Sequence, residues 1–243
     1  AYDIHERLVG SEMCIRDSMN IQYEDKELLV VYKPAGLATQ SARVTSPDLV
    51  SSVTRHLKGA PVYVVHRLDQ PVEGLLVLAK TKQAAAGLSK QLQAGTLNKQ
   101  YYALVYRGAE ELPKEEILAD YLWKNPQTQK AEIVAQASGK GKQAKLHYRV
   151  MTGKDDIALL DVRIETGRFH QIRAQLAHAG FPILGDQKYG TQTSMERSEE
   201  LGIKNVSLFA YALTFTHPKT GKQMEFQAKT QNPAISHLLT TMN

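Results

Sequence analysis

The chain has 243 residues, of which 42% are hydrophobic and 23% charged, the profile of an ordinary globular protein. No stretch approaches the roughly 20 apolar residues that a membrane-spanning helix needs, so we expect no membrane association. The net charge is +5 and the isoelectric point about 9.1, which suits a polyanionic partner because phosphates attract clustered lysine and arginine. Charge alone does not decide the point, since many basic proteins bind no nucleic acid.

The first eighteen residues differ from the rest of the chain. They show neither the pattern of a secretory signal nor helical or alternating periodicity. Codons for Met13–Asp17 match a sequencing-adapter string, so we expect residues 1–18 to be a non-native leader and residues 19–243 to form one domain. A disordered native tail is the alternative. Cys14, the one cysteine, lies in this leader, and a remainder without cysteine fits a reducing cytoplasm.

The first predicted elements are a strand and a helix. The apolar run over residues 28–32 predicts a buried strand that ends before Pro34. The next segment predicts a helix with Ser46 as N-cap, Pro47 at its first position and Gly59 as its stop. Its apolar residues recur every four positions, at Leu49, Val53 and Leu57.

The remaining elements mix strands and helices without a regular βαβ rhythm. In chain order we expect strands at 62–65 and 75–80, a helix from the cap Thr81 to Ala94, a strand over 97–107, several antiparallel strands within 119–166, a helix within 167–180, strands at 206–216 and 223–227, and a short C-terminal helix. This order predicts an α+β fold with a mixed, mostly antiparallel central sheet flanked by helices and loops.

A charged cluster, HRLD (66–69), stands between two apolar runs. Asp69 follows a predicted strand and precedes a turn, a position where loops commonly carry chemistry. An aspartate that caps the turn explains the same pattern. Arg67 likewise fits either a surface ion pair or a ligand contact.

A second cluster places Arg168, His170 and Arg173 at the beginning of a predicted helix. Residues three apart share a helical face, so we expect His170 and Arg173 to point together. Such a cationic wall suits either a phosphodiester or a buried carboxylate.

Four ordered segments together resemble the successive motifs of the RluA-type pseudouridine synthases. They are YKPAGL (32–37), HRLDQPVEGLLVLAKT (66–81), KQYYALV (99–105) and GRFHQIRAQLAHAGFPILGDQKYG (167–190). The resemblance runs from about residue 25 to residue 227 and implies the pseudouridine synthase catalytic fold, without the S4-type RNA-binding module of many relatives.

The resemblance also implies roles for single residues. Asp69 would be the catalytic aspartate, Arg173 its basic partner, and Tyr101 the aromatic residue against the target base. Arg67 would fill the space that a flipped uridine leaves in the RNA. The same motifs place further candidates for RNA contact at His66, Arg168, His170 and Lys33.

The implied reaction is the isomerisation of uridine in structured ribosomal or transfer RNA. It breaks the bond from N1 to C1′ and joins C5 to C1′, so it oxidises nothing and needs no cofactor and no metal. Arg173 would keep Asp69 ionised in a water-poor pocket. RNA is the expected partner of a cytoplasmic monomer with no implied protein partner.

Two positions depart from the family pattern. Val72-Glu73 stands where Thr-Ser is usual, and Tyr32 where Asn is usual. Strand alternation predicts that Glu73 faces outward and leaves activity intact; Tyr32 has no evident explanation in the sequence.

Other classes fit the sequence less well. A kinase would need a Gly-rich loop and Asp-Phe-Gly, and a zinc hydrolase a HExxH motif. A catalytically inactive RNA-binding assembly factor of the same fold is the alternative, against which the intact Asp69, Tyr101 and Arg173 argue.

Overall fold

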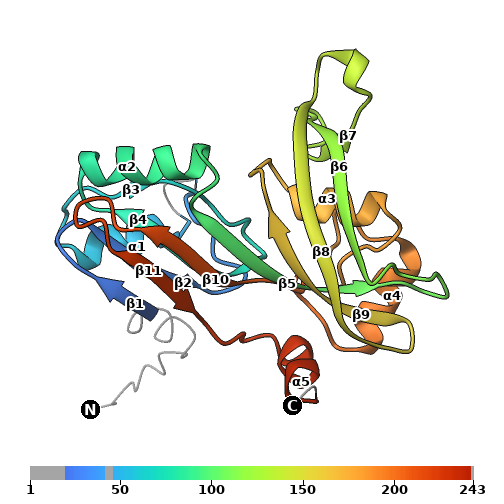
Figure 1. Ribbon diagram of the computed structural model, residues 1–243. Helices are drawn as coiled ribbons and strands as arrows, with labels where there is room; N and C mark the ends of the chain where they lie inside the picture. Colours follow the sequence, from blue (N-terminus) through green and yellow to red (C-terminus); the bar gives the residue numbers. More distant parts are fainter. Residues whose placement is uncertain (1–19, 42–45, 242–243) are drawn as a thin grey trace, which may run out of the picture.

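The computed structural model describes residues 20–41 and 46–241, so the expected leader lies outside the described residues. One large sheet forms the centre of the molecule (Figure 1). Its strands are β1 (Asn20–Glu24), β2 (Leu28–Lys33), β3 (Tyr63–Val64), β4 (Glu73–Ala79), β5 (Asn98–Tyr106), β6 (Glu115–Lys124), β7 (Ala131–Ile133), β8 (Lys142–Lys154), β9 (Ile157–Ile164), β10 (Leu208–Thr216) and β11 (Gln223–Gln227). The helices are α1 (Leu49–His56), α2 (Lys82–Gln93), α3 (Gln171–His178), α4 (Gln192–Glu200) and α5 (Pro233–Thr241), with a 3₁₀ turn at Gln136–Ser138.

The strands follow the order β1-β2-β4-β10-β5-β9-β8-β6-β7, with β3 beside β4 and β11 beside β10. β4 and β10 pair in parallel over a short register, and the neighbouring pairs on either side of them are antiparallel. The predicted α+β fold with a mixed, mostly antiparallel sheet is therefore confirmed. In Figure 1, β5 and β10 run between a half that contains β1–β4 with α1 and α2 and a half that contains β6–β9 with α3 and α4.

The central strands are buried on both faces because helices cover both. In β2, Leu29 and Val31 join the apolar cluster that includes α1 and α3. Leu28 and Val30 point to the opposite cluster, which includes α2. Successive side chains of a strand alternate between faces, so a continuous apolar run places one row in each cluster.

Helix caps show where local sequence patterns succeed and where they fail. Thr81 caps α2 as predicted, with its side chain accepting from the amide of Ala84. Ser46 is not the cap of α1; Asp48 is, and its carboxylate accepts hydrogen bonds from the amides of Ser41 and Ser51. A carboxylate that satisfies two amides caps better than one hydroxyl, so the helix begins two residues later than predicted.

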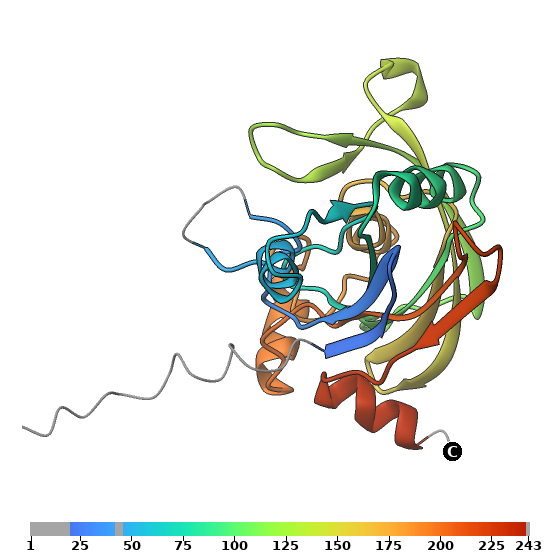
Figure 2. The same ribbon diagram turned by 90° about the vertical axis from the view of Figure 1, so that its left-hand side faces the viewer.

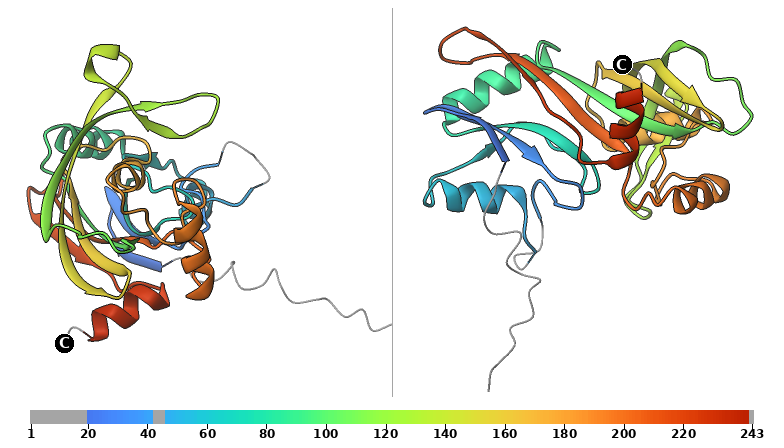
Figure 3. Two further views of the ribbon diagram at one scale, coloured as in Figure 1. Left: turned by 90° about the vertical axis from the view of Figure 1, so that its right-hand side faces the viewer. Right: turned by 90° about the horizontal axis from the view of Figure 1, so that it is seen from below.

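Two parts reach away from the centre of the sheet. β6, β7 and the loop leading into β8 extend beyond the rest of the molecule, as the turned views show (Figures 2 and 3). The C-terminal helix α5 is the second part, and it is attached to the sheet through Ile235, which is buried in a cluster with residues of β5, β9 and β10. Among the described residues no helix combines the length and the apolarity that crossing a membrane requires.

Candidate active site

Asp69 lies in the loop between β3 and β4, and this loop is held on both sides of it. Thr39 Oγ1 donates to the carbonyl of Leu68 at 2.8 Å and accepts from the Leu68 amide at 3.2 Å. On the other side, the carbonyl of Gln70 accepts from the amide of Gly36 at 2.9 Å. These contacts fix the backbone of the loop, while the Asp69 carboxylate remains 26% exposed and lines a pocket.

Arg173 is the basic partner that the motif predicted. It lies in α3 with its side chain 5% exposed, and its Nη1 donates to Asp69 Oδ2 at 3.1 Å. The other side of the guanidinium is taken by Asp186, with Nε to Oδ2 at 2.7 Å and Nη2 to Oδ1 at 2.8 Å. A planar fork bound in this bidentate way has little freedom to rotate, so Arg173 presents a fixed nitrogen to Asp69.

Tyr101 lines the same pocket from β5 and is buried. Burial, and after it the charge of Asp69, raises the pKa of the Tyr101 hydroxyl, which therefore stays protonated. The neutral ring offers a flat face on which a nucleobase can stack. The structure thus brings together Asp69, Arg173 and Tyr101, the three residues that the motifs selected as catalytic.

His170 lies close to Asp69, although not on the helix where it was predicted. Its backbone has a left-handed φ of 50° and it precedes α3 as the N-cap residue, because the helix begins at Gln171. Its Nε2 lies 3.7 Å from Asp69 Oδ2 and its Nδ1 2.8 Å from the hydroxyl of Tyr189. Burial lowers the pKa of His170 to about 4, so the ring is neutral at pH 7 and does not form an ion pair with Asp69 there.

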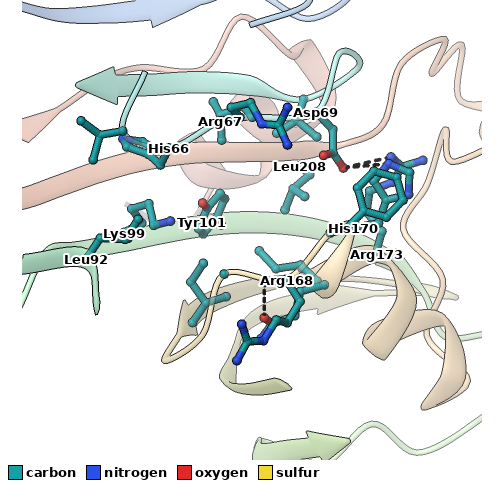
Figure 4. A pocket seen from close by; sticks show the side chains of 18 of the residues that line it. His66, Arg67, Asp69, Leu92, Lys99, Tyr101, Arg168, His170, Arg173 and Leu208 are labelled. Atoms are coloured by element: carbon teal, nitrogen blue, oxygen red, sulfur yellow. Dashed lines mark hydrogen bonds and ion pairs between the residues drawn. The ribbon is translucent and has the colours of Figure 1, made fainter. Parts of the chain in front are cut away.

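The two remaining arginines lie at the exposed side of the pocket. Arg67 and Arg168 are both exposed and both line a pocket of about 520 Å³ that also includes Asp69 and Tyr101. A second pocket, of about 550 Å³, adjoins it and shares Arg67, Asp69 and Arg173. Figure 4 shows Arg67, Asp69, Tyr101 and Arg168 around the first pocket. The Nε of Arg168 donates a hydrogen bond to the carbonyl of Gln143.

Lys33 and His66 were predicted to contact RNA, and the structure buries both. The Lys33 ammonium group is fully buried and donates to the carbonyls of Pro34, Leu37 and Gln70. Its donors are used inside the protein, on the loop beside Asp69, and the prediction that Lys33 contacts RNA stays a prediction. His66 is also buried, but it lines the pocket and so remains able to reach a molecule inside it.

The two departures from the family pattern contact each other. The Tyr32 hydroxyl donates to Glu73 Oε2 at 2.6 Å. Glu73 also accepts from the Thr230 hydroxyl and from the amides of Gln231 and Asn232 at 3.3 Å. The prediction that Glu73 faces outward was wrong because β4 is buried on both faces. Glu73 nevertheless lies on the side of β4 opposite the Asp69 pocket, together with Leu75 and Val77.

Two residues that the sequence did not single out belong to the site. Asp186 orients Arg173, and it stands in the segment GDQKYG at the end of the fourth motif. Lys99 lines the pocket from β5, two residues before Tyr101, a spacing that places both side chains on one side of a strand. That spacing was readable in the sequence once the strand had been predicted.

Comparison with known proteins agrees with this geometry. The profile of the RNA pseudouridylate synthase family matches residues 27–178. Ribosomal large subunit pseudouridine synthase D of Zymomonas mobilis is 36% identical over 222 residues, covering 87% of this chain and 69% of the relative. Ribosomal large subunit pseudouridine synthase C of Pasteurella multocida is 33% identical over 209 residues, covering 86% of this chain and 63% of the relative.

Solved structures show the same fold. Human RNA Pseudouridylate Synthase Domain Containing 4 superposes with a TM-score of 0.71 at 22% identity, covering 92% of each chain. Human RNA Pseudouridylate Synthase Domain Containing 1 does so with a TM-score of 0.72 at 19% identity, covering 93% of this chain and 94% of that one. From the matched profile, the curated relatives and the shared fold we conclude that the chain belongs to the RNA pseudouridylate synthase family, as the RluA-type motifs predicted.

Proposed function

We propose that this pseudouridine synthase isomerises specific uridines in structured ribosomal RNA, with Asp69 as the attacking carboxylate. The observation that carries the proposal is the contact between Asp69 and the buried Arg173 at 3.1 Å, in a pocket that Tyr101 also lines. Ribosomal RNA is favoured over transfer RNA because the relatives of Zymomonas and Pasteurella are named ribosomal large subunit pseudouridine synthases. The chain spans 69% and 63% of their lengths.

The chemistry needs only a positioned carboxylate and a held base. Isomerisation breaks the N1–C1′ bond, turns the uracil and joins C5 to C1′. C5 gives up its hydrogen to water and N1 takes up a proton, so the overall composition is unchanged. Arg173 holds the Asp69 carboxylate by a charge-assisted hydrogen bond, so the nucleophile is fixed before substrate arrives. Asp69 acts as a covalent nucleophile of the carboxylate type.

The target uridine must leave the RNA stack to reach Asp69. Unstacking costs roughly a few kcal/mol. Arg67, exposed at the pocket, can occupy the gap that the base leaves, while Tyr101 stacks on the base inside. Arg168 is exposed on the same side and suits a contact with a phosphate.

The test uses residues 19–243 and ribosomal RNA that carries tritium at uridine C5. Isomerisation releases tritium to water, because C5 exchanges its hydrogen for the bond to C1′. We expect release from the parent protein in the presence of a chelator and none from Asp69→Ala, with RNA affinity largely kept by both. Absence of release from both, with RNA binding intact, would favour the inactive assembly factor over the enzyme.

A further inference from the structure

The proposed reaction gives no role to the end of the pocket that Lys99 and His66 line, here called the inner end. In Figure 4, Lys99 and His66 lie to one side of Tyr101, and Asp69 with Arg173 lies to the other. All five residues line pockets that meet at Asp69. The inner end therefore faces whatever stacks on Tyr101, from the side opposite the nucleophile.

Lys99 is a cation without a counter-ion at this inner end. It is only 8% exposed, and among the described residues it has neither a hydrogen bond nor an ion pair. Burial lowers the pKa of Lys99 to about 8, which leaves the ammonium group mostly protonated at pH 7. A buried charge without a partner destabilises the fold, so its presence calls for a ligand.

His66 adds a second unused donor beside it. Its Nε2 accepts a hydrogen bond from the amide of Val77 at 3.3 Å, so in the neutral ring the proton is on Nδ1. Burial, and after it the charge of Lys99, lowers the pKa of His66, so the ring is neutral. Nδ1 is buried with no partner among the described residues.

We propose that Lys99 and the Nδ1–H of His66 bind the carbonyl edge of the flipped uracil, and that Lys99 stabilises the negative charge of the base while it is detached from the sugar. This inference rests on the proposed function. A flipped nucleotide enters base first and its phosphates stay with the RNA strand outside, so the inner end meets the base edge. Two donors match the carbonyls of uracil, whereas the amino group that cytosine carries in place of O4 would face a donor.

The bond changes show when the charge arises. When N1–C1′ breaks, its electron pair stays on the uracil, whose charge spreads over its carbonyl oxygens, and the Asp69 carboxylate bonds to C1′. The base turns, C5 bonds to C1′ and displaces the carboxylate, the C5 proton leaves to water, and N1 takes up a proton from water. The hydrogen bond from the Lys99 ammonium group to a carbonyl oxygen would be strongest while the base is detached from the sugar. It would therefore lower the activation barrier of the reaction and leave the affinity for RNA almost unchanged.

The test compares Lys99→Met, Lys99→Arg and the control Lys222→Met, an exposed lysine in the turn between β10 and β11. Tritium release is measured in single turnover at saturating RNA. Lys99→Met should slow release about 100-fold, as the loss of one donor to a developing oxyanion does. Its dissociation constant for RNA should change by less than about threefold. Lys99→Arg should recover part of the rate, and Lys222→Met should match the parent.

A stability measurement separates this role from a structural one. Lys99→Met removes an unpaired buried charge, so its thermal midpoint should rise while its rate falls, the signature of a functional residue. A parental rate for Lys99→Met at saturating RNA would overturn the inference, and so would a loss confined to RNA affinity or a lowered thermal midpoint. Failure of the proposed function itself is distinguishable, because the parent protein would then release no tritium.

Discussion

Asp186 holds Arg173 in a side-on, bidentate ion pair, and only the remaining Nη1 of the guanidinium is directed at Asp69. The side chain of Asp186 is fully buried and that of Arg173 nearly so. The Asp69 carboxylate therefore meets an arginine that is itself held by Asp186, thirteen residues further along the chain. This arrangement predicts that Asp186 matters for both stability and rate.

Asp186→Asn should lower the free energy of unfolding by about 3 kcal/mol, because it leaves the buried Arg173 with one carboxylate partner in place of two. It should also slow tritium release about 100-fold, since a freed guanidinium no longer fixes Asp69. Asp156→Asn is the matched control: it breaks a half-buried pair with Arg197 and should cost less than about 1 kcal/mol. Equal losses for the two variants in urea denaturation would contradict this account.

Tyr32 and Glu73 should behave as one unit. Tyr32→Phe removes the donor and Glu73→Met removes the acceptor of a 2.6 Å hydrogen bond. The loss of unfolding free energy in the double variant should therefore differ from the sum of the two single losses by at least about 1 kcal/mol. Release of tritium should stay within about twofold of the parent, because the pair lies on the side of the sheet opposite Asp69. The measurement is a double-mutant cycle by chemical denaturation. Additive effects would show that the two unusual residues are independent.

His170 should make the protein sensitive to acid. Its pKa is lowered from 6.5 in the unfolded chain to about 4, so between these values the unfolded state binds a proton that the native state does not. The stabilisation that neutral His170 gives the native state is complete above pH 6.5 and is lost as the pH falls toward 4. Between pH 7 and pH 4, the free energy of unfolding of His170→Gln should therefore fall by up to about 3 kcal/mol less than that of the parent. Parallel stability curves for the two proteins would refute the assignment.

Lys33→Met should weaken the support of the Asp69 loop. It removes three hydrogen bonds from a buried ammonium group to backbone carbonyls, one of them the carbonyl of Gln70. We expect a loss of about 2–3 kcal/mol in unfolding free energy and a slower single-turnover rate at unchanged RNA affinity. Lys26→Met, at an exposed position, should be silent in both assays. Reduced RNA affinity for Lys33→Met alone would instead support a role in RNA contact.

Arg67→Ala should harm turnover on structured RNA more than on an unstacked target. The exposed guanidinium can fill the gap left by the flipped base, at a site where unstacking costs roughly a few kcal/mol. Rates on a stem-loop and on a short single strand with the same target would be compared, with the exposed Arg55→Ala of α1 as control. Equal losses on both substrates would remove the gap-filling role.

Much of the fold could be predicted because its signals are local. The apolar run of β2, the cap Thr81 of α2 and the alternation of β5 each arise from residues within one element, and the structure confirms them. Two local features were missed. α4 was not predicted, and Asp48 in place of Ser46 caps α1.

The same division holds for the site. The four motifs selected Asp69, Tyr101 and Arg173 from the sequence, because each stands in a short and recognisable context. That Asp69 meets Arg173 across 104 residues, that Glu73 finds Tyr32, and that Lys33 is buried under three carbonyls follow only from the packed chain. Hydrophobic periodicity says which side of an element is buried, but burial of a polar group is stable only beside a partner, and the partner is supplied by tertiary structure.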